Sequence, residues 1–88
     1  MQGQLQLYRV KFEFESMTAQ KRQATELIKI VANNIKQYRL KKNLSQERLE
    51  DETGLTIARY ESGNHDMTLT TICILSQHLD LEPYELLK

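Results

Sequence analysis

From Thr18 onward, the apolar residues of this chain recur at the spacing of an α-helix, and this periodicity determines the predicted fold class. Up to Asn43 they fall at steps of four and three residues, so they form one stripe along a long helix: Ala24, Ile28, Val31, Ile35 and Tyr38. Asn43 tolerates the left-handed conformation that is common just past a helix C-terminus, so the helix is predicted to end there. The pattern is typical of an all-α fold.

Two short helices are predicted to follow the long one. Ser45 is a good N-cap for the first of them, which buries Leu49. Gly54 then interrupts the helical pattern, and Ile57 and Tyr60 fall one turn apart on the next helix. Both helices are therefore predicted to present one apolar side to a common core.

Two further helices complete the predicted bundle. Thr68 can cap the first of them, and Pro83 suits the first turn of the second, which places Leu86 inside. The predicted inner face of the helix after Thr68 consists of Leu69, Ile72, Cys73, Ser76 and Leu79. Together with the earlier helices they give a compact five-helix bundle, which we assign to residues 17–88.

Residues 1–16 form an arm with a different pattern. Its apolar residues alternate with charged ones, and this period of two is the mark of a half-buried strand: Tyr8, Val10, Phe12 and Phe14. No second run in the chain alternates in this way, and an unpaired strand tends to pair with another molecule. Two predictions stay open for the arm: an antiparallel ribbon with residues 7–15 of a second subunit, or a disordered leader ahead of Met17.

Size and composition favour a binding module over an enzyme. Eighty-eight residues suffice for one small core but leave little chain for a catalytic cleft. The Ser, His and acidic residues have neither the spacing of a catalytic triad nor that of a metal site, and His65 in particular has no partner at ligand spacing. We therefore expect no enzymatic activity, no cofactor and no metal.

The charges are divided along the chain. Residues 1–43 hold nine Lys or Arg against three acids, and residues 44–88 hold three against nine, so a net charge of zero conceals +6 and −6. This division is suited to orienting the basic part on DNA or to self-association through opposite charges.

The sequence also indicates the compartment. No apolar run approaches the roughly 18 residues that are needed to span a bilayer, and the N-terminus lacks a secretory pattern. The single cysteine, Cys73, excludes an internal disulfide and agrees with a reducing environment. We expect a cytoplasmic protein with no membrane partner.

Three blocks of sequence occur in an order that is found together in one protein family. They are Leu44-Ser45-Gln46-Glu47, then Ile57 with Glu61 and Gly63, then Leu69, Ile72 and Leu79. Through these blocks, residues 28–87 resemble the XRE, or lambda-repressor-like, family of helix-turn-helix proteins. The resemblance implies a transcriptional regulator that binds double-stranded DNA as a homodimer, with recognition helices in successive major grooves about 34 Å apart.

The resemblance also indicates which residues contact DNA. Gln46, in the first turn of the second helix, is expected to donate to a phosphate oxygen. On the third helix, the outward residues are expected to be Thr56, Ala58 and Arg59, and Arg59 can bind guanine O6 and N7 or a phosphate. Further candidates for backbone contacts are Asn64 and His65 in the following loop, and the basic residues Lys36, Lys41 and Lys42.

The family pairs an arginine late in the first helix with a glutamate late in the third. Arg39 and Glu61 match those two positions. We therefore predict a salt bridge between them that ties the recognition helix to the rest of the domain.

The sequence departs from the family between Gln46 and Ile57, where the family usually has three more residues. Either Gly54 is the turn glycine and the third helix starts at residue 55 or 56, or Thr53 caps the third helix and residues 54–56 form the base-reading turn. The first placement is favoured because glycine is costly inside a helix.

The same region is acidic, since residues 45–66 contain two Arg against six acids, a net charge of −4. Glu50, Asp51 and Glu52 must point away from phosphates or DNA binding must be weak. The alternative function is therefore a protein-interaction or antitoxin-like module that keeps the fold with little DNA reading. Ile74, which falls outside the predicted inner face of its helix, also favours a protein partner.

Overall fold

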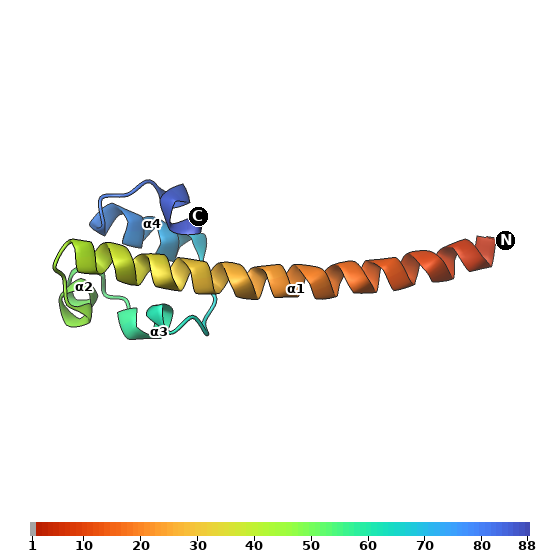
Figure 1. The fold of residues 1–88 in the computed structure, drawn as a ribbon, viewed down its shortest axis with the longest axis horizontal. Helices are drawn as coiled ribbons and strands as arrows, with labels where there is room; N and C mark the ends of the chain where they lie inside the picture. The colour runs from red at the N-terminus through yellow and green to blue at the C-terminus, as the bar shows by residue number, and fades with distance from the viewer. Residues whose placement is uncertain (1) are drawn as a thin grey trace.

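The computed structural model describes the backbone of residues 2–88 and the side chains of residues 19–88. In this part, the elements are α1 (Gln2–Lys41), α2 (Gln46–Thr53), α3 (Ile57–Glu61), α4 (Leu69–His78) and a 3-10 helix, η1 (Pro83–Leu87). Figure 1 shows the four shorter elements gathered around the C-terminal half of α1, while its N-terminal half projects alone. The molecule is accordingly elongated, with extents of 63 × 21 × 19 Å.

The all-helical fold class is confirmed, but the predicted N-terminal strand is wrong. Residues 7–15 lie within α1, and residues 2–88 contain no strand. The alternation of apolar and charged residues is a local signal, whereas a strand also needs a neighbouring strand to bond its backbone. A helix satisfies those backbone groups within one segment, without a second strand from the same chain or from another molecule.

The predicted fifth α-helix is also wrong in type. Pro83–Leu87 forms a short 3-10 helix, with Glu82 and Glu85 in a reciprocal capping box. The backbone N–H of Glu82 donates to Glu85 Oε2 at 2.8 Å. Five residues that begin with a proline give few α-helical hydrogen bonds, and 3-10 geometry is common in such short pieces. Leu86 is nevertheless fully buried, as predicted.

The core forms where the shorter elements meet α1. Its central residues are fully buried and come from all five elements: Ile35, Leu49, Ile57, Leu75 and Leu86. On α1, Val31 is also buried and Ile28 is half-buried, whereas Ala24 is exposed. The predicted stripe is therefore correct only from about residue 28 onward, because the other elements pack against α1 only there.

The inner face of α4 differs from the predicted one. Leu69 is 80% exposed and Cys73 is exposed, while Thr71, Ile72, Leu75 and Ser76 are buried. Leu69 directly follows the Thr68 cap, and its side chain points away from the core. The predicted face included Leu69 and Cys73 and so was rotated relative to the face that packs.

The predicted helix ends are confirmed. The Ser45 hydroxyl accepts from the Arg48 N–H at 3.0 Å, and that of Thr68 accepts from the Thr71 N–H at 3.1 Å. Asn43 has a φ of 57° and Gly54 a φ of 74°, both in the left-handed region that commonly closes a helix. These caps and left-handed residues therefore fix where the helices begin and end.

Gly54→Ala should lower the free energy of unfolding by about 1 kcal/mol, since an alanine in the left-handed conformation costs roughly 1–2 kcal/mol. A Cβ at Gly54 meets no atom within 4 Å, so the loss is one of backbone conformation alone. Gly54→Asn is the matched control, because asparagine tolerates this conformation. Urea unfolding measures both, and an alanine variant as stable as the asparagine variant would contradict this account.

Candidate nucleic-acid interface

The connection between α2 and α3 follows the favoured placement of the shortened segment. Gly54 is the turn residue, and its N–H donates to the Glu50 carbonyl at 2.7 Å. α3 begins at Ile57. Thr53 does not cap α3, because its hydroxyl donates to the Leu49 carbonyl within its own helix at 2.7 Å. The turn is thus short, and α3 starts late.

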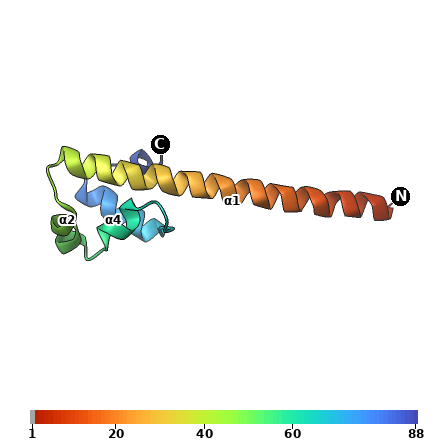
Figure 2. The same cartoon turned by 60° about the horizontal axis from the view of Figure 1, so that its bottom comes forward.

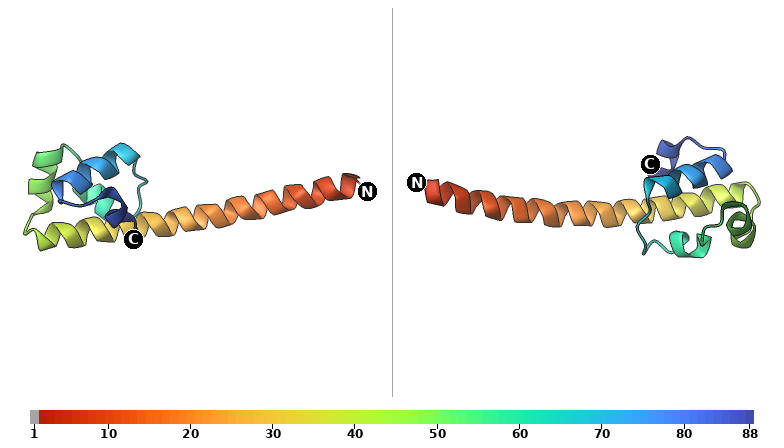
Figure 3. Two further views of the ribbon diagram at one scale, coloured as in Figure 1. Left: turned by 90° about the horizontal axis from the view of Figure 1, so that it is seen from above. Right: turned by 180° about the vertical axis from the view of Figure 1, so that it is seen from behind.

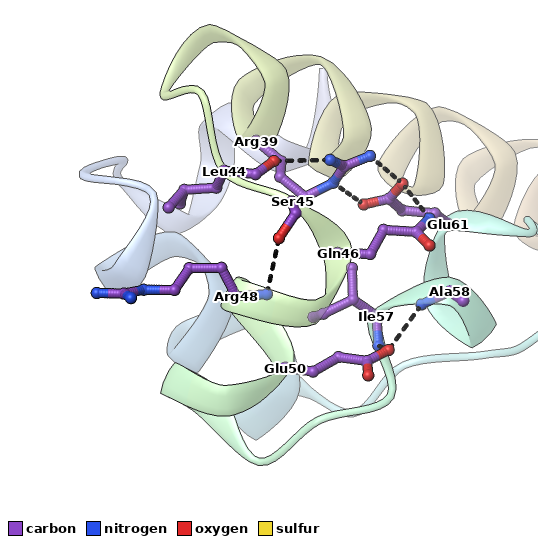
Figure 4. A network of polar contacts seen from close by, with 9 residues as sticks. All are labelled: Arg39, Leu44, Ser45, Gln46, Arg48, Glu50, Ile57, Ala58 and Glu61. Carbon is purple, nitrogen blue, oxygen red and sulfur yellow. Dashed lines mark hydrogen bonds and ion pairs between the residues drawn. The ribbon is translucent and has the colours of Figure 1, made fainter.

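Glu50 caps α3 across this turn. Its Oε1 accepts from the backbone N–H of Ile57 at 3.0 Å and from that of Ala58 at 3.5 Å (Figure 4). Thr56, at the N-cap position, makes no side-chain cap bond. The first N–H groups of a helix lack partners within it and favour a negative charge, so the carboxylate stabilises the start of α3.

The sequence interpretation missed this role, although a signal for it was present. The sequence places Glu50 in the acidic run shortly before the glycine turn, where a carboxylate can reach the amides of the helix that follows. The shortened connection brings the last turn of α2 next to the start of α3. Glu50 is therefore placed to bond the first amides of α3.

The predicted pair between Arg39 and Glu61 is present and buried. Arg39 Nε donates to Glu61 Oε2 at 2.6 Å, and Nη2 donates to Oε1 at 3.0 Å. The remaining donor, Nη1, bonds the Leu44 carbonyl at 2.8 Å (Figure 4). The two side chains are 7% and 4% exposed. The hydrogen bond with Glu61 raises the pKa of Arg39 above its ordinary value, against the opposing effect of burial.

Gln46 belongs to the same buried network. Its Nε2 donates to Glu61 Oε1 at 3.0 Å, and the side chain is half-buried. The amide that was predicted to bind a phosphate therefore helps to hold Glu61.

The acidic residues around α2 do not form one exposed surface. Glu61 bonds Arg39, Glu50 caps α3, and Glu52 Oε1 accepts from Arg48 Nε at 3.0 Å. Glu52 Oε2 also lies 3.8 Å from His78 Nδ1 on α4. Three of the six acids between residues 45 and 66 are thus engaged inside the domain. The negative charge that is left to repel DNA phosphates is therefore smaller than the sequence suggests.

The structure places three of the predicted contact residues together. Thr56, Ala58 and Arg59 are exposed on α3 or at its start, and Asn64 is exposed in the loop that follows. In the part of the chain whose side chains are described, no ion pair engages Arg59. This outward side of α3 is the candidate DNA surface.

Three other predicted residues contact groups within the domain or are partly buried. Lys42 Nζ pairs with Asp80 and bonds the His78 carbonyl at 3.2 Å, so it lies against the end of α4. His65 is half-buried, and its Nδ1 is buried without a hydrogen-bond partner among the described residues. Lys41 lies 5.0 Å from the centre of the Tyr38 ring.

One basic residue next to α3 was not among the predicted contacts. A Cβ built on Gly63, just past the end of α3, would lie 3.6 Å from the Cγ of Lys29. Lys29 is exposed, and Lys36 lies two turns further along the same side of α1. The spacing of seven residues between the two lysines is visible in the sequence, but their position beside α3 is not.

Comparisons with known proteins agree with this arrangement. A family model described as helix-turn-helix matches residues 35–86, which is more than half of the chain. The searches of curated proteins and of solved structures found no match.

Breaking the buried pair from one side should destabilise the domain strongly. Glu61→Ala should lower the free energy of unfolding by about 3–5 kcal/mol, since it leaves the Arg39 charge buried without a partner. The double variant Arg39→Met with Glu61→Leu should recover most of this loss. The charge swap Arg39→Glu with Glu61→Arg should recover less than the apolar pair, because a carboxylate at residue 39 faces the Leu44 carbonyl. Chemical unfolding compares the three, and equal losses in all of them would contradict the pairing.

Removing the cap from α3 should have a smaller effect. Glu50→Ala should cost about 1 kcal/mol of unfolding free energy, the usual value of a lost N-cap. Glu50→Gln is the matched control, since its amide oxygen can still accept from Ile57. Asp51→Ala, at an exposed neighbour that forms no bond in the described part of the chain, should leave stability unchanged. If Asp51→Ala lowered the thermal unfolding midpoint as much as Glu50→Ala does, the capping role of Glu50 would be refuted.

Proposed function

The chain belongs to the helix-turn-helix family, and from this premise we propose that it is a sequence-specific transcriptional regulator that binds double-stranded DNA as a homodimer. The family is a DNA-binding, regulatory one and not a catalytic one, so DNA binding in general follows from membership. Sequence specificity, the contact residues and the dimer are our proposals. No helix in the described part of the chain is long and apolar enough to cross a membrane.

The observation that carries the proposal is the open outer side of α3. Thr56, Ala58 and Arg59 are exposed there. An arginine on this side can donate two parallel hydrogen bonds to guanine O6 and N7 in the major groove. Thr56 and Ala58 are small, which lets the helix approach base edges and the thymine methyl group closely.

Phosphate contacts come from a small set of exposed cations. Lys29 and Lys36 lie on the side of α1 next to α3, and in the part of the chain whose side chains are described no ion pair engages either of them. Asn64, in the loop after α3, supplies a neutral donor. With two cations that neutralise phosphates, the logarithm of affinity should fall with the logarithm of salt with a slope of only about −2 per subunit.

A protein-interaction module is the second candidate function, and exposed apolar surface favours it. Leu69 is 80% exposed on α4, while Ile74 is half-buried. Such a module would keep the helix-turn-helix fold and use it to bind another protein. The two candidates differ in one measurable property, the dependence of DNA binding on salt.

The full chain should bind random duplex DNA at low salt and release it as salt rises, with the shallow slope given above. Fluorescence anisotropy on a labelled random duplex at low and moderate salt measures this. Absence of salt-dependent binding would favour the interaction module over the regulator.

Arg59→Ala should weaken binding to duplexes selected from a random pool by about 5- to 150-fold, equivalent to the 1–3 kcal/mol of one bidentate base contact. It should also broaden the range of selected sequences. Arg48→Ala is the matched control, because Arg48 pairs with Glu52. Equal losses in both variants would mean that general charge, and not base reading by Arg59, accounts for binding.

A further inference from the structure

We propose that the projecting part of α1 carries a second DNA contact, in which Lys21 and Arg22 bind phosphates beyond the duplex segment that α3 occupies. The inference rests on the proposed function, since it extends the DNA surface of α3 along α1. Both residues precede the helix-turn-helix unit of residues 35–86. The contact is therefore an addition to that unit and not a part of it.

Three basic residues form a straight row on α1. Arg22, Lys29 and Lys36 recur every seven residues, so they lie within about 40° of one another around the helix. All three are exposed. Successive members lie two turns, or roughly 10 Å, apart along the helix axis, so the whole row measures roughly 21 Å. It therefore begins on the projecting part of α1 and ends beside the domain.

The row borders the side of α1 that holds α3. That side is marked by Arg39, which bonds Glu61 of α3. Lys21 lies on the same line of the helix as Arg39, because eighteen residues complete five turns, and the row lies about 60–100° around the helix from this line. Asn34, which donates to the Leu86 carbonyl of η1, lies about 120–160° from the row. Lys21 and the row therefore continue the surface of α3 and not that of η1.

The projecting part of α1 continues past α3. Figure 2, in which the side of α3 comes forward, shows α1 running on beyond the loop that follows α3. In the right view of Figure 3, α3 lies below α1 and α4 above it, and within residues 2–88 only α1 extends toward the N-terminus. A duplex that lies against α3 and continues in that direction consequently meets α1 alone.

The charges of this surface fit a phosphate backbone. A shallow hollow on α1 is lined by three cations and one acid, with one neutral residue: Lys21, Arg22, Lys29, Glu26 and Thr25. In the part of the chain whose side chains are described, no ion pair engages Lys21 or Arg22. Duplex DNA carries one negative charge per about 1.7 Å of its axis, so the roughly 10 Å between Lys29 and Arg22 span several phosphates.

The same surface lacks what a lipid membrane requires. Helices that lie on membranes combine their cations with a face of large apolar side chains. The residues interleaved with this row at steps of three and four are Thr25 and Ala32, which are both small. The surface is therefore suited to a polyanion with closely spaced charges, and the duplex bound by α3 lies directly beside it.

The added contact has a measurable effect on salt dependence. Lys29 and Lys36 alone give a slope of about −2 per subunit, and two more phosphate contacts bring it to about −4. At 0.1 M salt, two such contacts strengthen binding by about 60-fold. Phosphate contacts read no bases, so the preferred sequence should stay the same.

The test is a salt titration by fluorescence anisotropy, on duplexes selected from a random pool by the natural chain. The double variant Lys21→Gln with Arg22→Gln should bind about 60-fold more weakly at 0.1 M salt, with a slope near −2 in place of −4. Glutamine has a helix propensity close to that of lysine and arginine, so α1 is preserved. The matched control is Lys41→Gln with Lys88→Gln, which removes the same charge from residues that each lie over a tyrosine ring. It should bind as the natural chain does.

Phosphate ethylation locates the contact on the duplex. Ethylation of phosphates outside the segment that α3 occupies should weaken binding of the natural chain, and should have no effect on the Lys21 and Arg22 double variant. Circular dichroism of both double variants establishes that the fold is retained before the comparison is made.

The possible results separate this inference from the proposed function. A Lys21 and Arg22 double variant that keeps the affinity and slope of the natural chain would overturn the second contact and leave DNA binding by α3 standing. Equal losses in the two double variants would also overturn it, because general charge would then account for binding. A natural chain that binds no duplex at any salt concentration would overturn the proposed function together with this contact.

Discussion

The buried ion pair between Arg39 and Glu61 is the contact on which the rest of the site depends. Through three hydrogen bonds, the Arg39 guanidinium joins α1 to the end of α3 and to the carbonyl that precedes α2. Gln46 adds a bond from α2 to the same carboxylate. Buried charges are tolerated only when they are paired, so these elements cannot move apart without a large free-energy cost. The hydrogen bond with Glu61 raises the pKa of Arg39 further above a value that already keeps an arginine charged.

The buried ion pair between Arg39 and Glu61 explains how so short a recognition helix is held in position. α3 has five residues, Ile57–Glu61, and a helix of that length does not form on its own in water. A glutamate holds each end: Glu50 bonds the first amides, and Glu61 anchors the last turn to Arg39. Ile57 is fully buried between them. Side chains from α1 and α2 thus replace the hydrogen bonds that a longer helix would make within itself.

The sequence predicted the contacts that depend on local chemistry. It did not predict the features that depend on which segments pack together in the fold. The caps at Ser45 and Thr68, the glycine turn and the paired Arg39 and Glu61 are each set by residue types at fixed spacing. The strand at residues 7–15 was wrong because alternation is a local signal, and a helix bonds the same backbone groups within one segment. The cap from Glu50 was missed for a related reason. It joins two helices across a turn, and the direction of a long side chain depends on what packs around it.

Two sides of α1 hold different parts of the chain in place. The side that bears Val31, Ile35 and Arg39 builds the helix-turn-helix unit and fixes α3. The side centred on Leu27 bears no charged residue between Gln20 and Asn34, and the Asn34 amide donates to the Leu86 carbonyl of η1 at 2.9 Å. Because α1 is one continuous helix, η1 on the second side and α3 on the first are both fixed in position relative to the same axis.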